Sequence, residues 1–437
     1  QGHDHNGYLP AEKARRQKRR LYAENFGPMK LIPAKRHIVS GIISILALLI
    51  TAGCAWRQPP AEESAPALIR LSVEDYPDFT DGLFLDNLTH GIGKSLAYLS
   101  RIPAERMIRF GDDSYSAFHL SRSLAVLRDF VEGRPDSEAL NRFITARFRV
   151  YRSAGGPESG RVLFTGYYEP HLRGSRVPDQ RYRYPVYSLP QDLMVIDLSP
   201  FGEAFEGQRI VGRLEGGTVV PYPDRQAIAS DPDFAGRAAP IAWVDDRVDL
   251  FFLQIQGSGR VYLSDGTFIR VHYHASNGRP YRSIGRLLID QGKIPAEEMS
   301  MQRLKAYLEA HPDEVDGILN HNPSYVFFKT ETSGPIGAIG VDLTPGRSVA
   351  VDRRVFPMAA AAFLQTQIPV VDGNGRIDRW MDFSAFALSQ DTGGAIRGPG
   401  RVDIFWGNGP YARIAAGHMQ HKGAFYLLIL DPDIPAP

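Results

Sequence analysis

The chain has 437 residues, of which 43% are hydrophobic and 23% charged, an ordinary globular composition that is sufficient for two or three domains with buried cores. The formal net charge is only +1, so the overall balance does not favour nucleic acid as a partner, and the basic run 13–20 is interpreted as a solvated flank. The single cysteine, Cys54, excludes an intramolecular disulfide and a cysteine-ligated metal site.

Residues 29–54 have the pattern of a bacterial secretion leader. Lys30 and the pair 35–36 are basic, the stretch 38–52 is apolar, and small residues precede Cys54. An apolar stretch of about 15 residues is short for a helix that must cross about 30 Å of hydrocarbon. We therefore expect a signal peptide, although an uncleaved membrane anchor fits the same pattern.

The end of this leader, LITAGC at 49–54, resembles a bacterial lipobox, with Thr51 where leucine or valine is commoner. Lipidation of Cys54 would make this residue the mature N-terminus, and the absence of aspartate at the next position, Ala55, favours delivery to the outer membrane. A polar stretch follows the cysteine, as expected of a linker between an anchor and a domain. The expected segments are an upstream part at 1–28 before a start at Met29, a signal peptide at 29–53 and a linker at 54–67.

The apolar spacing is helical between about 68 and 160. Leu124, Leu127 and Val131 follow one another at i, i+3 and i+7, and a second stripe runs from Leu140 to Phe148. We interpret both stripes as core-facing sides of helices and not as functional sites.

Beyond residue 160 the pattern changes to strands, with one helix expected at 301–310. Asp265-Gly266 between two short runs predicts a hairpin, and the apolar run at 249–255 is interpreted as a buried strand. Short strands broken by glycine and proline favour a β-barrel over a doubly wound sheet. The expected strands are 161–168, 249–255, 260–263, 267–272, 323–329, 348–351, 370–371, 383–388, 402–406 and 424–430.

Three aspartates close to predicted strand ends are candidate catalytic groups: Asp352, Asp391 and Asp403. The apolar run 404–406 follows Asp403 directly, so low-dielectric surroundings are expected to raise the pKa of this carboxyl group. A carboxyl group that stays protonated near neutral pH suits glycosidic cleavage, because the leaving oxygen must receive a proton. Aspartates beside glycine are also common turn formers, and on the pattern alone that interpretation stays open.

Other kinds of site have weaker support. The sequence Asp391-Thr392-Gly393 matches aspartic proteases, but those enzymes need two such carboxylates and the chain has one copy. His272 and His274 share a face of a predicted strand without an evident third ligand, and no phosphate loop, dinucleotide fingerprint or His-Glu-x-x-His occurs. We expect no metal and no cofactor.

Adjacent tyrosines, Tyr167 and Tyr168, follow a glycine in a predicted strand. Neighbouring side chains of a strand point to opposite faces, so one ring is expected in the core and the other outside. An exposed ring can stack on the C–H face of a sugar. Core packing is the competing interpretation here, and the same two interpretations apply to Trp406.

Taken together, the motifs resemble the membrane-bound lytic murein transglycosylase A family, over about residues 70 to 430. The resemblance rests on ordered blocks and not on any one of them. The blocks are FTGYYEP at 164–170, FLQIQGSG at 252–259, YRSIGRLLID at 281–290, NPSYVFFK at 322–329, QDTGGAI at 390–396 and DIFWGNG at 403–409, followed by Ala416-Gly417.

The resemblance implies a mainly β fold with N-terminal helices. A double-psi β-barrel, called the 3D domain after three aspartates, would combine 68–169 with 331–437. A second β-barrel domain would be inserted at 170–330, with the substrate groove between the two.

The resemblance also implies roles for single residues. Asp403 matches the catalytic acid and base, Asp391 is expected to shape its hydrogen bonding and charge, and Asp352 is expected to brace strand ends. Glu169 and Glu215 are expected near the groove as auxiliary groups at best. The segment 204–237 departs from the family pattern, and within it Tyr222 is a candidate for glycan contact. The expected substrate-binding residues are Thr165, Gly166, Tyr167, Tyr168, Gln256, Gly257, Ser258, Gly259, Gly394 and Trp406.

The implied activity is non-hydrolytic cleavage of the β-1,4 bond between N-acetylmuramic acid and N-acetylglucosamine in peptidoglycan. The product is a 1,6-anhydromuramoyl end, and one carboxyl group serves both proton transfers. The implied setting is a periplasmic lipoprotein of the outer membrane, with murein synthases or amidases as candidate partners. A peptidoglycan-binding lipoprotein without catalysis is the alternative from a different functional class.

Overall fold

The computed structural model describes residues 66–156 and 160–434. The predicted upstream segment, the signal peptide, the lipidation site Cys54 and the predicted linker as far as residue 65 lie outside the described residues. Within the described part, no helix is long and apolar enough to cross a membrane.

The N-terminal part is helical, as predicted, and short strands alternate with its helices. Side-chain oxygens of Ser116 and Asp136 cap two of the helices by accepting backbone N–H groups. Leu124, Leu127 and Val131 are buried, which confirms the first predicted stripe. The elements are β1 (Leu68–Arg70), η1 (Val73–Asp75), α3 (Leu88–Leu99), β2 (Met107–Phe110), β3 (Asp113–Ser116), α4 (Ala117–Glu132), α5 (Ser137–Arg147) and β4 (Phe148–Ser153).

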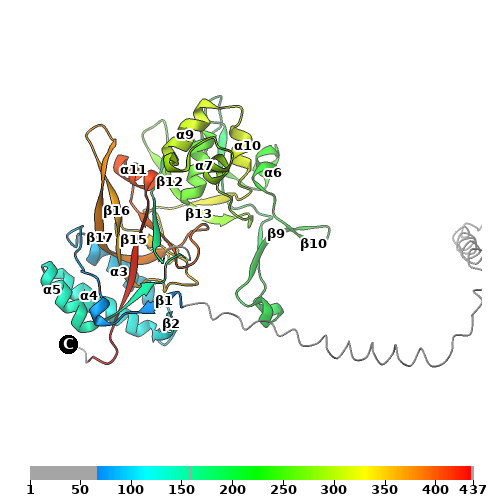
Figure 1. The fold of residues 1–437 in the computed structure, drawn as a ribbon. Helices are drawn as coiled ribbons and strands as arrows, with labels where there is room; N and C mark the ends of the chain where they lie inside the picture. The colour runs from blue at the N-terminus through cyan, green and yellow to red at the C-terminus, as the bar shows by residue number, and fades with distance from the viewer. Residues whose placement is uncertain (1–65, 157–159, 435–437) are drawn as a thin grey trace, which may run out of the picture. The chain divides into compact units, whose positions relative to one another are not determined.

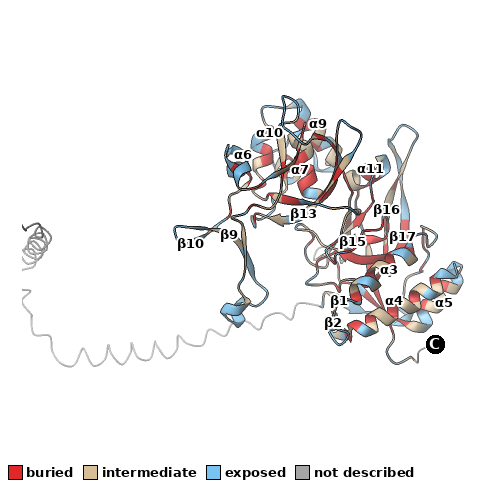
Figure 2. Ribbon diagram, turned by 180° about the vertical axis from the view of Figure 1, so that it is seen from behind, coloured by how far each residue is buried: buried red, intermediate tan, exposed pale blue. Residues whose placement is uncertain are grey.

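Six strands of the described chain close into a barrel, because the last strand pairs with β5 as well as with β16. The buried residues of these strands form the largest core, and the helices α3 and α4 pack against it (Figures 1 and 2). This closure confirms the predicted barrel. The ring runs β19 (Gln420–Leu430), β16 (Ala361–Val371), β17 (Ile377–Asp391), β15 (Ser348–Ala350), β18 (Arg401–Phe405) and β5 (Val162–Tyr167), with α11 (Pro410–His418) before β19.

A second sheet, also of six strands in the described chain, lies between β5 and β15 in sequence. A bridge between Ser188 and Phe328 joins the two ends of this sheet, and Gly266, at φ +83°, forms the predicted turn of the β12–β13 hairpin. The strand order is β14 (Val326–Thr330), β13 (Phe268–Ser276), β12 (Ser258–Tyr262), β6 (His171–Ser175), β11 (Pro240–Val244) and β7 (Tyr184–Tyr187). The helices of this region are α6 (Arg225–Ser230), η4 (Phe234–Gly236), α7 (Arg247–Gln256), α8 (Ile284–Asp290), η5 (Ala296–Glu298), α9 (Met301–Ala310) and α10 (Val315–Asn320).

The run at 249–255 is helix α7, so the predicted buried strand was wrong. A short, wholly apolar run has no readable period, and length and flanks must decide between helix and strand. Here Asp246 caps the helix start by accepting the N–H groups of Val248 and Asp249, and Gly257, at φ +80°, ends it. The predicted helix at 301–310 is confirmed as α9.

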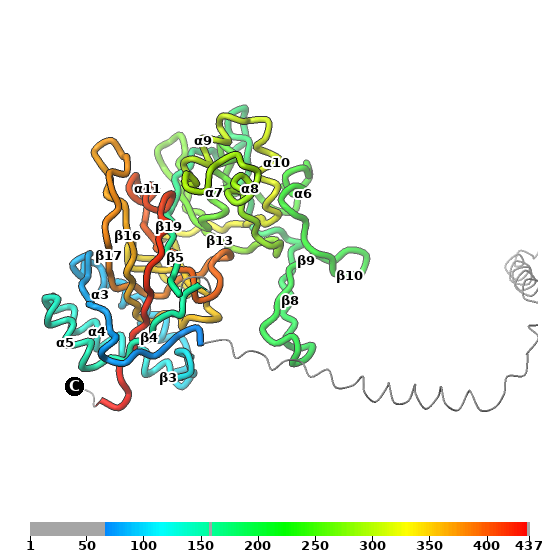
Figure 3. Tube along the Cα trace, viewed as in Figure 1, coloured from blue at the N-terminus to red at the C-terminus, as the bar shows by residue number. Residues whose placement is uncertain are grey.

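A three-stranded arm leaves the second sheet region (Figure 3). It consists of β8 (Met194–Asp197), β9 (Arg209–Glu215) and β10 (Thr218–Pro221), with η2 (Ser199–Phe201) and η3 (Glu203–Phe205) between the first two strands.

Candidate active site

Strand pairing brings Asp391 and Asp403 to the same level of the barrel. Ala350 of β15 pairs with Asp403 of β18 on one side and, after a register shift, with Asp391 of β17 on the other. Val402 and Ile404 are fully buried in the barrel, so the alternation of the strand directs Asp403 to the outer face.

The carboxylate of Asp391 accepts three hydrogen bonds from the described residues. The hydroxyl of Tyr167 donates to Oδ2 at 2.8 Å, and the backbone N–H groups of Thr392 and Ala338 donate to Oδ1 at 2.8 and 3.0 Å. Burial raises the pKa of Asp391 to about 6, and the three donors oppose that rise because they favour the charged form.

The carboxyl group of Asp403 has far fewer partners. Its Oδ1 is buried and has no hydrogen-bond partner among the described residues, and Arg401 Nε lies 3.7 Å away. Burial raises the pKa of Asp403 to about 6, the positive charge of Arg401 lowers it, and the negative charge of Asp391 raises it further. This direction agrees with the pKa shift predicted from the sequence.

Two interacting carboxyl groups share their protons, so their hydrogen bonds decide which one is charged. Asp391 accepts three N–H or O–H groups, whereas the described residues leave Asp403 Oδ1 without any. The negative charge therefore belongs on Asp391 and the proton on Asp403 when the pair holds a single proton.

Tyr281 brings the inserted region to this pair. Burial raises the pKa of the Tyr281 hydroxyl, a hydrogen bond with Ser283 and the charge of Arg401 lower it, and the charge of Asp403 raises it. Tyr281 is 40% exposed, and its hydroxyl lies close enough to Asp403 for the charge of that carboxylate to act on it. Neither Tyr281 nor Arg401 was predicted as a site residue from the sequence. The signals were available: Tyr281 begins a motif block, and Arg401 lies two residues before Asp403 on the same strand face.

Thr165 and Tyr167 of β5 lie beside the aspartates. Thr165 pairs with Asp403 in the parallel ladder and accepts a long hydrogen bond of 3.4 Å from Arg401 Nη2. Tyr167 reaches Asp391 through its hydroxyl, and burial, together with that carboxylate, raises the pKa of the phenol well above its ordinary value.

The remaining predicted binding residues lie in two places: where the chain passes from the barrel into the insert, and in the core of the barrel. The backbone N–H of Tyr168 donates to Oε1 of Gln256 at 2.9 Å, where the chain crosses from the barrel into the insert. Trp406 is only 9% exposed and packs over Gly166, where a Cβ atom would lie 2.8 Å from the indole. This burial favours a packing role for the indole.

The backbone conformation and the close packing explain why glycine occupies positions 257 and 259. Gly257 ends α7 with a positive φ, and a Cβ on Gly259 would lie 3.0 Å from the carbonyl oxygen of Pro170. Ser258 is buried within β12, and Gly394 is exposed shortly after Asp391.

Asp352 lies in a different environment from the other two aspartates. It is fully buried, Arg354 donates to both of its oxygens, and the N–H of Gly398 donates at 2.8 Å. Burial alone would raise the pKa of Asp352, but these donors hold it at about 2. A permanently charged, saturated carboxylate suits the bracing role expected for this residue.

Three further expectations gain no support. Tyr222 is fully buried and donates its hydroxyl to Asp192 at 2.7 Å, so the expected glycan contact is wrong. Glu169 is 2% exposed and paired with Arg260 at 2.8 Å. Glu215 belongs to β9 of the arm, where it pairs with a neighbouring arginine.

The candidate metal-binding histidines lie on β13, and within the described chain no group of three or more His, Cys, Asp or Glu side chains could hold a metal.

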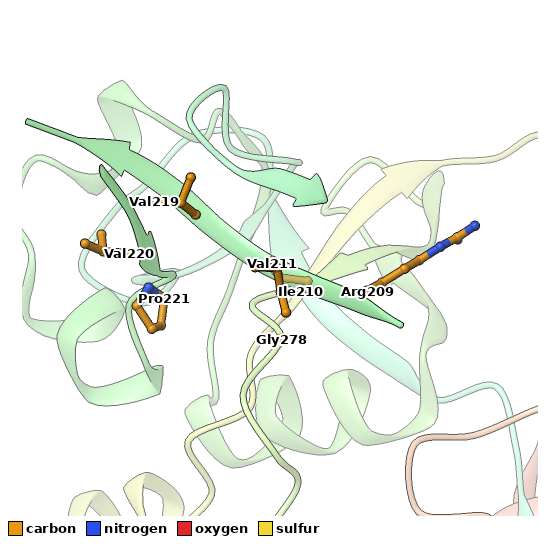
Figure 4. Close-up of a pocket in the computed structure, with 7 residues that line it drawn as sticks. All are labelled: Arg209, Ile210, Val211, Val219, Val220, Pro221 and Gly278. Carbon is orange, nitrogen blue, oxygen red and sulfur yellow. The ribbon is translucent and has the colours of Figure 1, made fainter. Parts of the chain in front are cut away.

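Two surface hollows lie apart from the carboxyl pair. One, of about 320 Å³, lies at the root of the arm and is lined mainly by apolar side chains, while the Arg209 side chain extends away from it (Figure 4). The other, of about 330 Å³, lies at the junction of barrel and insert, between Tyr168, Phe252 and Arg413. Neither is lined by Asp391 or Asp403, so neither defines the candidate site.

Comparison with known proteins identifies two family regions in the chain. Residues 163–329 match the MltA specific insert domain, and residues 347–429 match the 3D domain. Among curated proteins, the membrane-bound lytic murein transglycosylase A of Escherichia coli K12 is 32% identical over 289 residues, 65% of this chain and 70% of that protein. The enzyme of the same name from Vibrio cholerae is 30% identical over 313 residues, 68% of this chain and 76% of that protein.

Solved structures agree with this relationship. A membrane-bound lytic murein transglycosylase from Agrobacterium tumefaciens superposes with a TM-score of 0.68 at 32% identity, over 83% of this chain and 98% of that one. E. coli MltA with bound chitohexaose gives a TM-score of 0.63 at 25% identity, over 84% and 95% of the two chains. The aspartate pair described above lies in the barrel of a chain that belongs to the membrane-bound lytic murein transglycosylase A family.

Proposed function

We propose that the protein is a lytic transglycosylase that cleaves the β-1,4 bond between N-acetylmuramic acid and N-acetylglucosamine and leaves 1,6-anhydromuramoyl ends. The names of its relatives support the reaction class, and a relative that binds chitohexaose supports a glycan substrate. The observation that carries the proposal is the carboxyl group of Asp403, whose burial raises its pKa to about 6 beside Asp391, a carboxyl group that accepts three hydrogen bonds.

In the finer architecture that we propose, the barrel is of the double-psi type and combines 68–169 with 331–437, while 170–330 form an inserted β-barrel domain. The closed ring of strands supports the first part, and the bridged second sheet supports the second. The glycan groove lies between the two, where Tyr281 of the insert faces Asp403 of the barrel.

In the first step, Asp403 transfers its proton to the glycosidic oxygen as the bond to the muramoyl C1 breaks. The new negative charge on Asp403 lies beside Arg401, whose positive charge stabilises it. The negative charge of Asp391 opposes the ionisation of Asp403, so the Asp403 carboxylate is a stronger base than an ordinary aspartate in the next step.

In the second step, the Asp403 carboxylate takes the proton of the muramoyl C6 hydroxyl while O6 bonds to C1. The carboxyl group is regenerated, the sugar loses no atoms to solvent, and no water is consumed. This cycle needs one acid and base, in contrast to hydrolysis, in which a second carboxylate acts as nucleophile or activates water.

The same proposal assigns the glycan contacts. Thr165, Tyr167 and Tyr281 line the carboxyl pair, and their hydroxyl groups are suited to sugar hydroxyl and acetamido groups. Gly166 and Trp406 shape the strand behind them. The remaining members of the proposed binding set are Tyr168, Gln256, Gly257, Ser258, Gly259 and Gly394.

We also propose that the protein acts in the periplasm as an outer-membrane lipoprotein, anchored through Cys54 after removal of a signal peptide. The names of the relatives, which are membrane-bound enzymes, support membrane attachment, and the lipobox-like sequence supports the lipid anchor. Murein synthases and amidases, which act on the same polymer, are the proposed partners.

Digestion of purified sacculi in H₂¹⁸O tests the reaction. Mass spectrometry is expected to find anhydromuropeptides without ¹⁸O at the muramoyl C1, because O6 and not water attacks that carbon. Reducing ends that carry ¹⁸O would instead identify a hydrolase. Sacculi that are bound without release of any product would support the non-catalytic binding protein.

A further inference from the structure

One donor to Asp391 comes from a loop, residues 335–343, that we name the strap loop. Ala338 N donates to Asp391 Oδ1 at 3.0 Å, yet the residue is itself exposed. The loop closes on itself through an isolated bridge between Ile336 and Asp342. The position of this N–H, and hence its bond to Asp391, depends on whatever holds the loop in place.

Gln390, the residue before Asp391 in β17, holds one side of the loop. A Cβ atom on Gly337 would lie 2.5 Å from the carbonyl oxygen of Gln390, so the loop backbone is pressed against this residue. The Gln390 side chain is fully buried, and its amide donates to Gly91 O and to Ser95 Oγ, each at 2.9 Å. Both partners belong to α3, so Gln390 connects the strap loop to that helix.

Lys94 of α3 and Arg101, two residues beyond the end of that helix, hold the other side of the loop. Arg101 Nη2 donates to the carbonyl oxygens of Ile339, at 2.9 Å, and of Gly340, at 3.3 Å. Lys94 Nζ pairs with Asp342 at 2.9 Å. These contacts join residues more than 230 positions apart in sequence. They follow Ala338 in the loop, and the approach of Gly337 to Gln390 precedes it, so Ala338 lies between held residues.

We propose that Arg101 and Gln390 are positioning residues that tie the strap loop to α3, so that the Ala338 N–H keeps the charge on Asp391 and the proton on Asp403. This inference rests on the proposed function, to which it adds a role for the N-terminal helices. Neither residue touches the substrate; both act through the loop.

The charged and titratable groups that face Asp391 define the expected pH behaviour. Tyr167 donates to it from β5, Asp403 faces it from β18, and Arg401 lies beside Asp403. Activity requires a charged Asp391, so it rises with pH through the pKa of that group. Loss of the Ala338 donor favours the protonated form of Asp391, and the rising limb of the profile then moves to higher pH.

Arg101→Met tests the strap without disturbing a core, because Arg101 is exposed. The matched control is Arg128→Met, in which an arginine of α4 with a 40% exposed side chain loses its pair with Asp129. Carbon-13 NMR titration of the aspartate carboxyl groups is expected to show the pKa of Asp391 higher by about one pH unit in Arg101→Met, the scale of one hydrogen bond to a charged group. In Arg101→Lys the pKa of Asp391 is expected to lie between the values of wild type and Arg101→Met. In Arg128→Met it is expected to equal the wild-type value.

Kinetics on sacculi give the second measurement. In Arg101→Met, kcat at pH 5 is expected to fall about tenfold, with KM unchanged and the rising limb displaced in the same direction as the NMR titration. If Asp391 titrates identically in Arg101→Met and in wild type, the proposed role of Arg101 in positioning the strap loop is wrong. The NMR titration does not depend on enzyme activity. A wild-type protein without activity would refute the proposed function, and the role of the strap loop would still be tested by the titration.

Discussion

Tyr167 and Asp391 are hydrogen-bonded at 2.8 Å although their strands, β5 and β17, are separated in the sheet by β18 and β15. Neighbouring strands lie about 4.8 Å apart, so three spacings on a flat sheet would separate these strands by about 14 Å. Closure of the barrel and the length of the tyrosine side chain bring the two groups together. The fold itself therefore supplies one of the donors that keep Asp391 charged.

Tyr167→Phe removes this donor and leaves the ring in place. The pKa of Asp391 is expected to rise further above its ordinary value, and the rising limb of the pH profile then moves to higher pH with a kcat about tenfold lower. Tyr426→Phe is a matched control, because the hydroxyl of Tyr426 donates only a long hydrogen bond of 3.4 Å to Gln365. A Tyr167→Phe profile that overlays the wild-type profile would contradict the assigned charge on Asp391.

Arg401→Gln is expected to move the other limb. Activity needs a proton on Asp403, so it falls as pH rises through a pKa of about 6. The positive charge of Arg401 lowers that pKa, and its removal is expected to shift the falling limb upward by about one pH unit. Arg379→Gln is the control, because it removes the positive charge of an exposed arginine that pairs with Asp378. A downward shift would show that Arg401 does not act on Asp403 in this way.

Asp352→Asn is expected to affect stability and not chemistry. The folded protein holds the pKa of Asp352 at about 2, below its ordinary value, so the stabilisation is present above pH 4 and is lost as pH falls toward 2. The substitution is expected to lower the free energy of unfolding by about 2 kcal/mol at pH 7, measured by urea denaturation. The yield of anhydromuropeptides per folded molecule should persist, and its loss would place Asp352 in the catalytic machinery.

Gly166→Ala tests the packing of Trp406. The new methyl group would lie 2.8 Å from the indole and 3.0 Å from the Cα of Ala416, so the ring or α11 must shift. We expect a loss of about 1–3 kcal/mol in the free energy of unfolding, with altered tryptophan fluorescence. Unchanged stability and fluorescence would show that the indole has more space than the structure gives it.

The barrel was predictable because strands and turns are marked by residues that are neighbours in the sequence. Alternation and Gly or Pro breaks marked 402–406 and 424–430 correctly as strands, and Asp265-Gly266 marked the hairpin. Helix α7 was not predicted, because an unbroken apolar run carries no period; its helical signal is the capping residue Asp246.

The candidate site was predictable only in part. Single aspartates could be selected by their neighbours in sequence, but which of them carries the proton depends on donors such as Ala338 and Tyr167, from other strands and loops. Tyr281 reaches the pair from the insert, more than a hundred residues before Asp403. Trp406, in a motif block, and Tyr222, outside the blocks, show the converse: an aromatic side chain that is a candidate for glycan contact can be buried for packing.

The central claim is that one carboxyl group, that of Asp403, both gives and takes back the proton. The most direct test compares wild type with Asp403→Asn on purified sacculi, with the fold of each checked by circular dichroism and the anhydromuropeptides counted by mass spectrometry. The claim predicts a folded variant whose release of anhydro products is lower by about 10²–10⁴-fold, because an amide cannot act as the acid or the base. A folded Asp403→Asn protein that releases them at the wild-type rate would contradict it.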